Sequence, residues 1–80
     1  MTRQDFITWA QAHGYTLDQY GHLQKTQGDA KFRYKLSRTA VRSEVQITFE
    51  NGKHEWLRRR SGYFSKLAIT PDGKLAGMTR

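Results

Sequence analysis

The sequence predicts an α+β fold, with one N-terminal helix packed on a twisted, mostly antiparallel sheet of four to six strands. Apolar residues recur at helical spacing only in the first 13 residues, and period-two alternation replaces this spacing over 31–36 and 41–49. An Asn-Gly pair at 51–52 then indicates a hairpin. Because 80 residues is the length of one small domain, residues 1–80 are expected to form a single domain.

Residues 2–13 are predicted to form the helix. Thr2 is a good N-cap, and Asp5, three residues later, completes a variant of the capping box. Gly14 suits the position after the helix end, where Tyr15 can fold back in a Schellman arrangement. One apolar stripe, at positions i, i+3, i+4 and i+7, is expected to anchor the helix to the core: Phe6, Trp9, Ala10 and His13.

Three strands are predicted to follow, a short one at 22–27 and longer ones at 31–36 and 41–49. Alternation in the second strand separates a cationic face from an apolar face. The cationic face carries Lys31, Arg33 and Lys35, and the apolar face carries Phe32, Tyr34 and Leu36. In the third strand the residues expected to face the core are Val41, Val45, Ile47 and Phe49, and those expected to face outward are Arg42, Glu44, Gln46 and Thr48.

The Asn51-Gly52 pair allows two hairpin registers. A two-residue type I′ loop would bury Trp56, expose Leu57 and place Glu44 opposite Arg59 as a favourable cross-strand pair. A longer loop with a glycine bulge would shift the register by one residue and bury Leu57 instead. The two-residue loop is the preferred prediction.

The C-terminal third is predicted to be irregular and then to form a second hairpin. In either register one arginine of 58–60 falls on the core face, so the strand is expected to end there. Residues 61–66 are expected to form a loop or tight crossover in which Phe64 fills the core. Short strands at 67–70 and 74–78 flank a Pro-Asp-Gly turn.

The net charge of +7 is concentrated in one part of the chain. Residues 31–66 contain only three acids, Glu44, Glu50 and Glu55, while the rest of the chain is balanced. A segregated positive field attracts polyanions, although basic strands can also serve only to keep a small protein soluble. The basic residues of this segment are Lys31, Arg33, Lys35, Arg38, Arg42, Lys53, Arg58, Arg59, Arg60 and Lys66.

No pattern in the sequence indicates catalysis, a metal or a cofactor. Nucleotide-binding, zinc-protease and nucleophile-elbow motifs do not occur, the three histidines are isolated, and there is no cysteine to complete a zinc site. The chain is therefore expected not to be an enzyme. A small toxin-like ribonuclease with His22 as acid or base ranks last among the functional hypotheses, because the C-terminal pattern indicates a hairpin rather than a final helix.

Signal-peptide and membrane-spanning segments are not expected either. Asp5 interrupts the N-terminal segment early, and apolar runs reach only two or three residues. The sequence is therefore interpreted as that of a cytoplasmic protein without a membrane partner.

The leading functional hypothesis is non-catalytic nucleic-acid binding through a basic sheet face and an adjacent aromatic loop. The partner would be DNA or RNA, contacted along its backbone or as a single strand, because the predicted helix is not basic. The alternative is a protein-interaction or inhibitor module that docks an acidic partner or adds a strand at a sheet edge. The residues predicted to contact nucleic acid are Lys31, Arg33, Lys35, Arg42, Arg59, Arg60, Tyr63 and Lys66.

Overall fold

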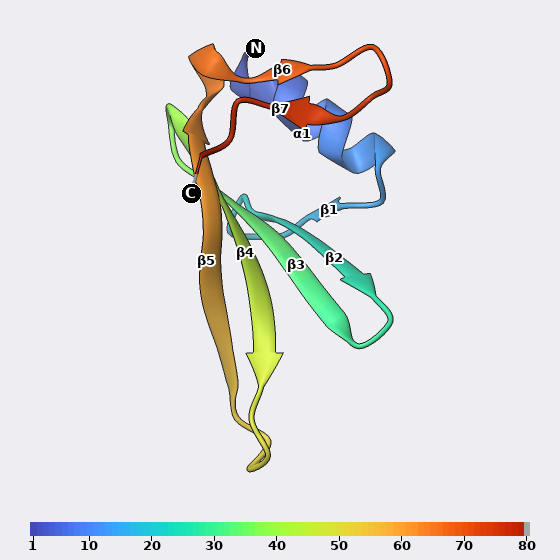
Figure 1. Ribbon diagram of the computed structural model, residues 1–80, viewed down its shortest axis with the longest axis vertical. Coiled ribbons are helices and arrows are strands. Elements are labelled where there is room, and N and C mark those ends of the chain that lie inside the picture. The colour runs from blue at the N-terminus through green and yellow to red at the C-terminus, as the bar shows by residue number, and fades with distance from the viewer. Residues whose placement is uncertain (80) are drawn as a thin grey trace.

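The computed structural model describes residues 1–79 and has the predicted α+β architecture, with one helix packed on a five-stranded antiparallel sheet (Figure 1). The strand order in this sheet follows the chain, β1-β2-β3-β4-β5, and β6 and β7 form a separate two-stranded sheet. The elements are α1 (Arg3–Ala12), β1 (Thr16–Leu17), β2 (Leu23–Gln27), β3 (Ala30–Leu36), β4 (Ala40–Thr48), β5 (His54–Tyr63), the 3-10 turn η1 (Phe64–Lys66), β6 (Ala68–Ile69) and β7 (Leu75–Ala76).

Both ends of α1 are capped as predicted. The Thr2 hydroxyl accepts a hydrogen bond from the Asp5 backbone N–H at 3.0 Å, and the Asp5 carboxylate accepts one from the Thr2 backbone N–H at 3.1 Å. At the C-terminal end Gly14 has φ +93°, and the Tyr15 N–H donates to the Ala10 carbonyl at 3.0 Å. These local bonds satisfy terminal backbone groups that the helix itself leaves unpaired.

The predicted apolar stripe of α1 is only partly correct. Phe6 and Ala10 are fully buried, but Ile7 is also buried, Trp9 is half-buried and His13 is exposed. The buried arc is wider than one stripe because α1 contacts two layers. The sheet lies on one side, and the segment from η1 to β7 on the other accepts hydrogen bonds from the N-terminal amine and the Trp9 indole.

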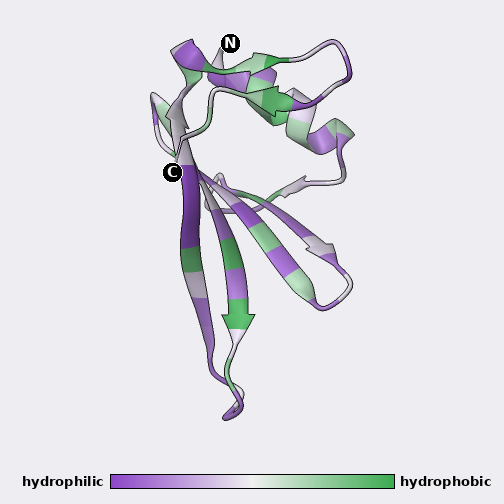
Figure 2. Cartoon of the chain, viewed as in Figure 1, coloured by the Kyte–Doolittle hydropathy of each residue, from purple (hydrophilic) through white to green (hydrophobic). Residues whose placement is uncertain are grey.

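The core is small and lies at one end of the sheet. Phe64 is buried there as predicted, and its neighbours include Leu23, Val41 and Leu67. A ten-residue helix is about 15 Å long, so it covers only the near end of the long β4–β5 hairpin. Hydrophobic and hydrophilic residues still alternate along β3 and β4 far from the helix (Figure 2). Phe49, predicted to face the core, is consequently 45% exposed.

The β4–β5 turn is the longer of the two predicted loops, so the preferred two-residue prediction is wrong. The Phe49 N–H donates to the Lys53 carbonyl at 2.8 Å, and the Gly52 N–H donates to the Phe49 carbonyl at 2.9 Å. Only Gly52 in this loop has a positive φ, +82°. A type I turn followed by one left-handed glycine thus replaces the type I′ turn, which would need positive φ at Asn51 as well.

The shifted register changes the surroundings of Trp56 and Leu57. Trp56 pairs with Gln46, and its half-buried side chain lies under Arg33 rather than in the core. Leu57 pairs with Val45 on the face that carries α1, but it lies beyond the helix and stays 42% exposed. The shift therefore does not bury Leu57, because no second layer formed by residues 1–79 covers this part of the sheet.

The prediction that the strand ends at 58–60 is wrong, because β5 contains a β-bulge and continues beyond these residues. The register shifts between Ser43 and Glu44, so Ser43 pairs with Arg60 and Glu44 with Arg58, and Arg59 is the extra residue. A bulge reverses the alternation of the bulged strand, which lets β5 continue to Tyr63. The predicted Glu44–Arg59 pair therefore does not form.

The C-terminal hairpin confirms the predicted pair of short strands. Ala68 pairs with Ala76, and Ile69 pairs with Leu75, around the Pro-Asp-Gly turn. Gly77, after β7, has φ +103°, and a Cβ atom there would collide with the Lys66 carbonyl oxygen. Glycine at this position therefore lets the chain pass close to η1 before Thr79 pairs with Ser61 of β5.

Candidate nucleic-acid interface

The face of the sheet opposite α1, here called the helix-free face, carries four of the predicted cationic residues. The β3–β4 register pairs Lys31 with Gln46, Arg33 with Glu44, and Lys35 with Arg42, so these side chains share one side of the sheet. Phe32, Tyr34 and Leu36 project to the other side, where Tyr34 packs edge-on against Phe6 of α1. The alternation predicted for 31–36 is thus present.

Arg33 is largely occupied by contacts within the protein. Its Nε and Nη2 atoms donate to Glu44 Oε1 at 2.9 and 2.6 Å, and its guanidinium lies 4.1 Å from the centroid of the Trp56 ring. The side chain is only 18% exposed. Glu44, predicted to face solvent, is only 6% exposed, and the Arg33 guanidinium lies against its carboxylate. Arg33 therefore has little freedom to bind a ligand.

Arg42 contacts the same carboxylate more loosely. Its Nε atom lies 3.5 Å from Glu44 Oε2 and makes no hydrogen bond with any atom of residues 1–79. The side chain is 39% exposed. One glutamate thus lies between two arginines, which leaves a net positive charge at the Arg42 end of the cluster.

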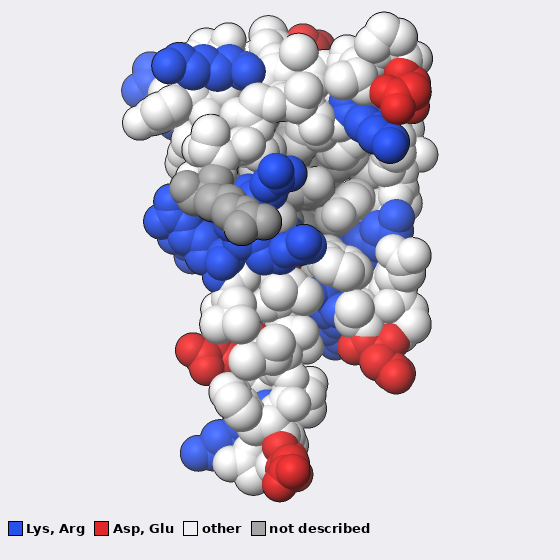
Figure 3. Space-filling view, in the orientation of Figure 1, with Lys and Arg blue, Asp and Glu red and all other residues white. Residues whose placement is uncertain are grey.

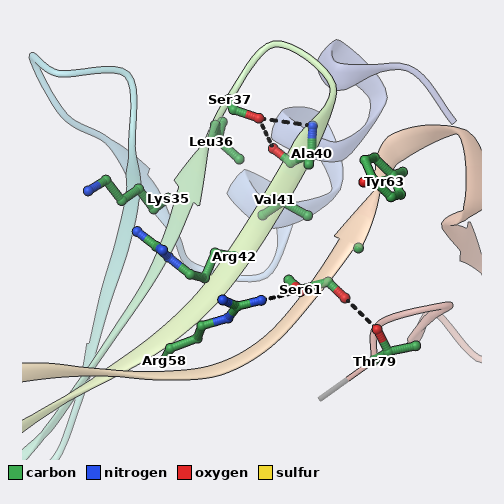
Figure 4. Close-up of a pocket in the computed structure, with 11 residues that line it drawn as sticks. Lys35, Leu36, Ser37, Ala40, Val41, Arg42, Arg58, Ser61, Tyr63 and Thr79 are labelled. Carbon is green, nitrogen blue, oxygen red and sulfur yellow. Dashed lines mark hydrogen bonds between the residues drawn. The ribbon is translucent and has the colours of Figure 1, made fainter.

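A pocket of about 440 Å³ lies beside Arg42, where β3, β4 and β5 approach the β3–β4 turn (Figure 4). Its cations are Lys35, Arg42 and Arg58, contributed by three successive strands. Tyr63 also lines the pocket and is 60% exposed. We call this the basic pocket, and its other lining residues are Leu36, Ser37, Ala40, Val41, Ser61, Gly62 and Thr79.

Hydrogen bonds fix the frame of the basic pocket but leave most of its charge uncompensated. Arg58 Nη2 donates to Ser61 Oγ at 3.0 Å, and Ser37 Oγ bonds to both the N–H and the carbonyl of Ala40 at 3.1 Å. Within residues 1–79 no ion pair involves Lys35 or Arg58. The pocket can therefore offer several N–H donors to an anion.

Arg58 was not among the predicted contact residues, and Arg59 and Arg60, which were, lie elsewhere. Because of the bulge, Arg59 and Arg60 line a hollow on the face that carries α1, together with Trp9. The predicted contact residues Arg59 and Arg60 therefore do not share a face of the sheet with Arg33 and Lys35. Lys66 lies on η1 and is exposed. Figure 3 shows Lys and Arg side chains gathered over the upper half of β5.

The histidines make ordinary structural contacts. His22 Nδ1 lies 3.3 Å from the Leu36 backbone N–H, which donates to it, and His13 Nδ1 is 2.8 Å from the Trp9 carbonyl oxygen. Hydrogen bonds from the His22 backbone N–H and from its neighbours lower the pKa of the Asp18 carboxyl. Among residues 1–79 no three His, Asp or Glu side chains come together in an arrangement that could hold a metal ion.

Comparison with family models, with curated proteins and with solved structures finds no match to this chain. No helix formed by residues 1–79 is long and apolar enough to cross a membrane. Function is therefore inferred from the geometry and charge of the basic pocket and its surroundings.

Proposed function

We propose that this protein binds nucleic acid without catalysis and that the basic pocket is where it holds the phosphate backbone. The observation that carries the proposal is that Lys35, Arg42 and Arg58 line one concave surface together with the exposed Tyr63 ring. Affinity for a phosphate chain requires several cations on one surface. An arginine also presents paired N–H donors that match phosphate oxygens.

A single strand is the form of nucleic acid that fits this surface best. Groove readout needs a helix or ribbon shaped to the groove, and α1 is packed between the sheet and the C-terminal hairpin with Arg3 as its one basic residue. Single strands are instead held by a cationic surface that follows the backbone and by aromatic rings on which bases stack. Tyr63 can supply such a ring next to the cations. The proposed compartment is the cytoplasm, where nucleic acid is accessible.

A protein partner is the second candidate, and a different surface favours it. Leu57 is exposed on β5 next to the half-buried Val45 and Phe32, beyond the end of α1. Within residues 1–79 the outer edge of β5 pairs only where Ser61 meets Thr79. An apolar strip beside an open strand edge suits strand addition by a partner. Binding of that kind would depend weakly on salt, unlike binding to phosphates.

Replacing Tyr63 by Ala should weaken single-strand binding by about 1–3 kcal/mol, because stacking on one base contributes that much. Duplex binding should change little, since paired bases are not free to stack on the ring. The measurement is fluorescence anisotropy with labelled single- and double-stranded DNA and RNA at about 50 mM salt, where phosphate contacts are strong.

Tyr20→Ala is the matched control, because Tyr20 is 75% exposed but does not line the basic pocket. It should leave both affinities unchanged. If the wild-type protein binds none of the four nucleic acids under these conditions, the proposed function is wrong. If Tyr63→Ala weakens duplex and single-strand binding equally, stacking is not its role.

A further inference from the structure

A second hollow, of about 500 Å³, lies between α1, β5 and the turn of the β6–β7 hairpin. We call it the aromatic hollow. It opens on the face of the sheet that carries α1, whereas the basic pocket lies on the helix-free face, so the two sites are separated by the sheet itself. The lining residues that matter for binding are Trp9, His13, Tyr34, Arg59, Arg60 and Lys74.

The β-bulge directs two cations into the aromatic hollow. Without the extra residue, regular alternation would place Arg59 and Arg60 on opposite faces of the sheet. With it, both line the hollow, while Arg58 lines the basic pocket. Bulges often re-aim side chains beside functional sites. Burial raises the pKa of the Tyr34 phenol, and the positive charges of Arg59 and Arg60 act in the opposite direction.

Three aromatic rings, those of Trp9, His13 and Tyr34, also line the aromatic hollow. Trp9 and Tyr34 have ring centroids 6.4 Å apart, and His13 lies 4.6 Å from Trp9. Trp9 is fixed in place because its indole N–H donates to the Gly73 carbonyl at 2.9 Å. Rings held in this way can pack against a planar ligand at little entropic cost.

The charge balance of the aromatic hollow favours an anion. Among the residues that the structure describes, three cations line it, Arg59, Arg60 and Lys74, against one acid, Asp72. The Lys74 ammonium is 3.9 Å from the Asp72 carboxylate, and Asp72 also accepts a hydrogen bond from the Thr70 hydroxyl. Within residues 1–79, Arg59 and Arg60 take part in no ion pair. These two guanidinium groups are therefore the ones that can hold an incoming anion.

We propose that the aromatic hollow is a binding site for a planar aromatic ring that carries a phosphate, of the size of a mononucleotide. The ring packs against Trp9 and Tyr34, and the phosphate accepts hydrogen bonds from Arg59 and Arg60. A volume of about 500 Å³ suits a ligand of this size. The proposal is independent of nucleic-acid binding, because it uses other residues on the other face of the sheet.

The test uses the fluorescence of Trp9. In a Trp56→Phe background Trp9 is the remaining tryptophan of the two in the chain. Titration with adenosine or uridine 5′-monophosphate should quench its emission saturably, with a Kd below about 1 mM. Arg59→Gln combined with Arg60→Gln should raise this Kd at least about tenfold, because charge-assisted hydrogen bonds to the phosphate are lost.

Lys31→Gln combined with Arg38→Gln is the matched control, because the pair removes the same two positive charges and both side chains are exposed and line neither hollow. It should leave the Kd within about twofold, as expected for an independent site. The resonance of the Trp9 indole N–H in NMR spectra reports both folding of each variant and ligand contact. Adenosine and inorganic phosphate, each tested alone, should bind more weakly than the monophosphate.

Three results would overturn the proposal. The first is that neither monophosphate quenches Trp9 saturably or shifts its indole resonance. The second is that the Lys31 and Arg38 pair of substitutions weakens binding as much as the Arg59 and Arg60 pair. The third is that inorganic phosphate binds as tightly as the monophosphate, which would make the hollow a plain anion site.

Discussion

Replacing Phe6 by Ala should lower the free energy of unfolding by about 3–5 kcal/mol, the usual cost of removing a large buried aromatic side chain. Phe6 is fully buried, and its ring contacts three others, with centroids 5.7 Å from Trp9, 4.9 Å from Tyr34 and 5.8 Å from Phe64. These rings belong to α1, β3 and η1, so Phe6 is the point at which helix, sheet and C-terminal segment meet. The cavity left by alanine would affect all three.

The loss is large relative to the stability expected of so small a domain. At roughly 0.05–0.15 kcal/mol per residue, a chain of this length is stable by only about 4–12 kcal/mol. Denaturant unfolding followed by circular dichroism measures the change, with Tyr20→Ala as an exposed aromatic control expected to shift stability by less than about 0.5 kcal/mol. A Phe6→Ala protein as stable as this control would contradict the assigned core.

Replacing Glu44 by Ala should lower the free energy of unfolding by about 3 kcal/mol, although a glutamate on the outer face of a sheet ordinarily contributes little to stability. The carboxylate is 6% exposed and lies between the guanidinium groups of Arg33 and Arg42. Removing it leaves two neighbouring cations without their shared counterion, one of them largely covered by the protein. Thermal and denaturant unfolding measure the effect.

Two variants show whether the lost stability comes from uncompensated charge. Glu55→Ala removes an exposed glutamate from β5 and should change stability by less than about 0.5 kcal/mol. Glu44→Leu combined with Arg33→Met should recover most of the loss, because apolar residues of similar volume often replace a buried ion pair without cost. If the double variant is no more stable than Glu44→Ala, the charge argument is wrong.

Features set by near neighbours in the chain were predictable from the sequence. The capping box of Thr2 and Asp5 and the Schellman end at Gly14 depend on residues within one helical turn, so composition and spacing suffice to identify them. The alternation of β3 likewise assigned Arg33 and Tyr34 to opposite faces. The burial of Ile7 was missed because a single stripe describes a helix with one packing partner, whereas α1 has two.

The β4–β5 register was not predictable with the same certainty. Asn51-Gly52 suits both a type I′ turn and a type I turn with a glycine bulge, and the two differ by one residue in pairing. The bulge at Arg59 could not be predicted from the sequence either. A bulge is recognised as a break in the alternation of polar and apolar residues, and three consecutive arginines have no such alternation. The one available sign was that regular pairing forced an arginine onto the core face.

The sequence predicted a cationic surface with an aromatic residue nearby, but it identified only some of the residues that line the basic pocket. Lys35, Arg42 and Tyr63 were named from the sequence, and all three line the basic pocket. Arg58 was missed because its face depends on the loop length and the bulge together. The burial of Glu44 was also missed, because its main partner, Arg33, comes from another strand and alternation alone assigns a charged residue to solvent.

The salt dependence of binding tests the phosphate-binding role of the basic pocket most directly. Each phosphate contact contributes about −0.7 to the slope of log affinity against log salt on a single strand, so Arg42→Gln combined with Arg58→Gln should flatten that slope by about 1.4. Affinity should fall for all sequences alike. Arg59→Gln combined with Arg60→Gln removes equal charge from the other face and should leave the slope unchanged. Equal slopes for the wild type and the Arg42 and Arg58 variant would contradict the account.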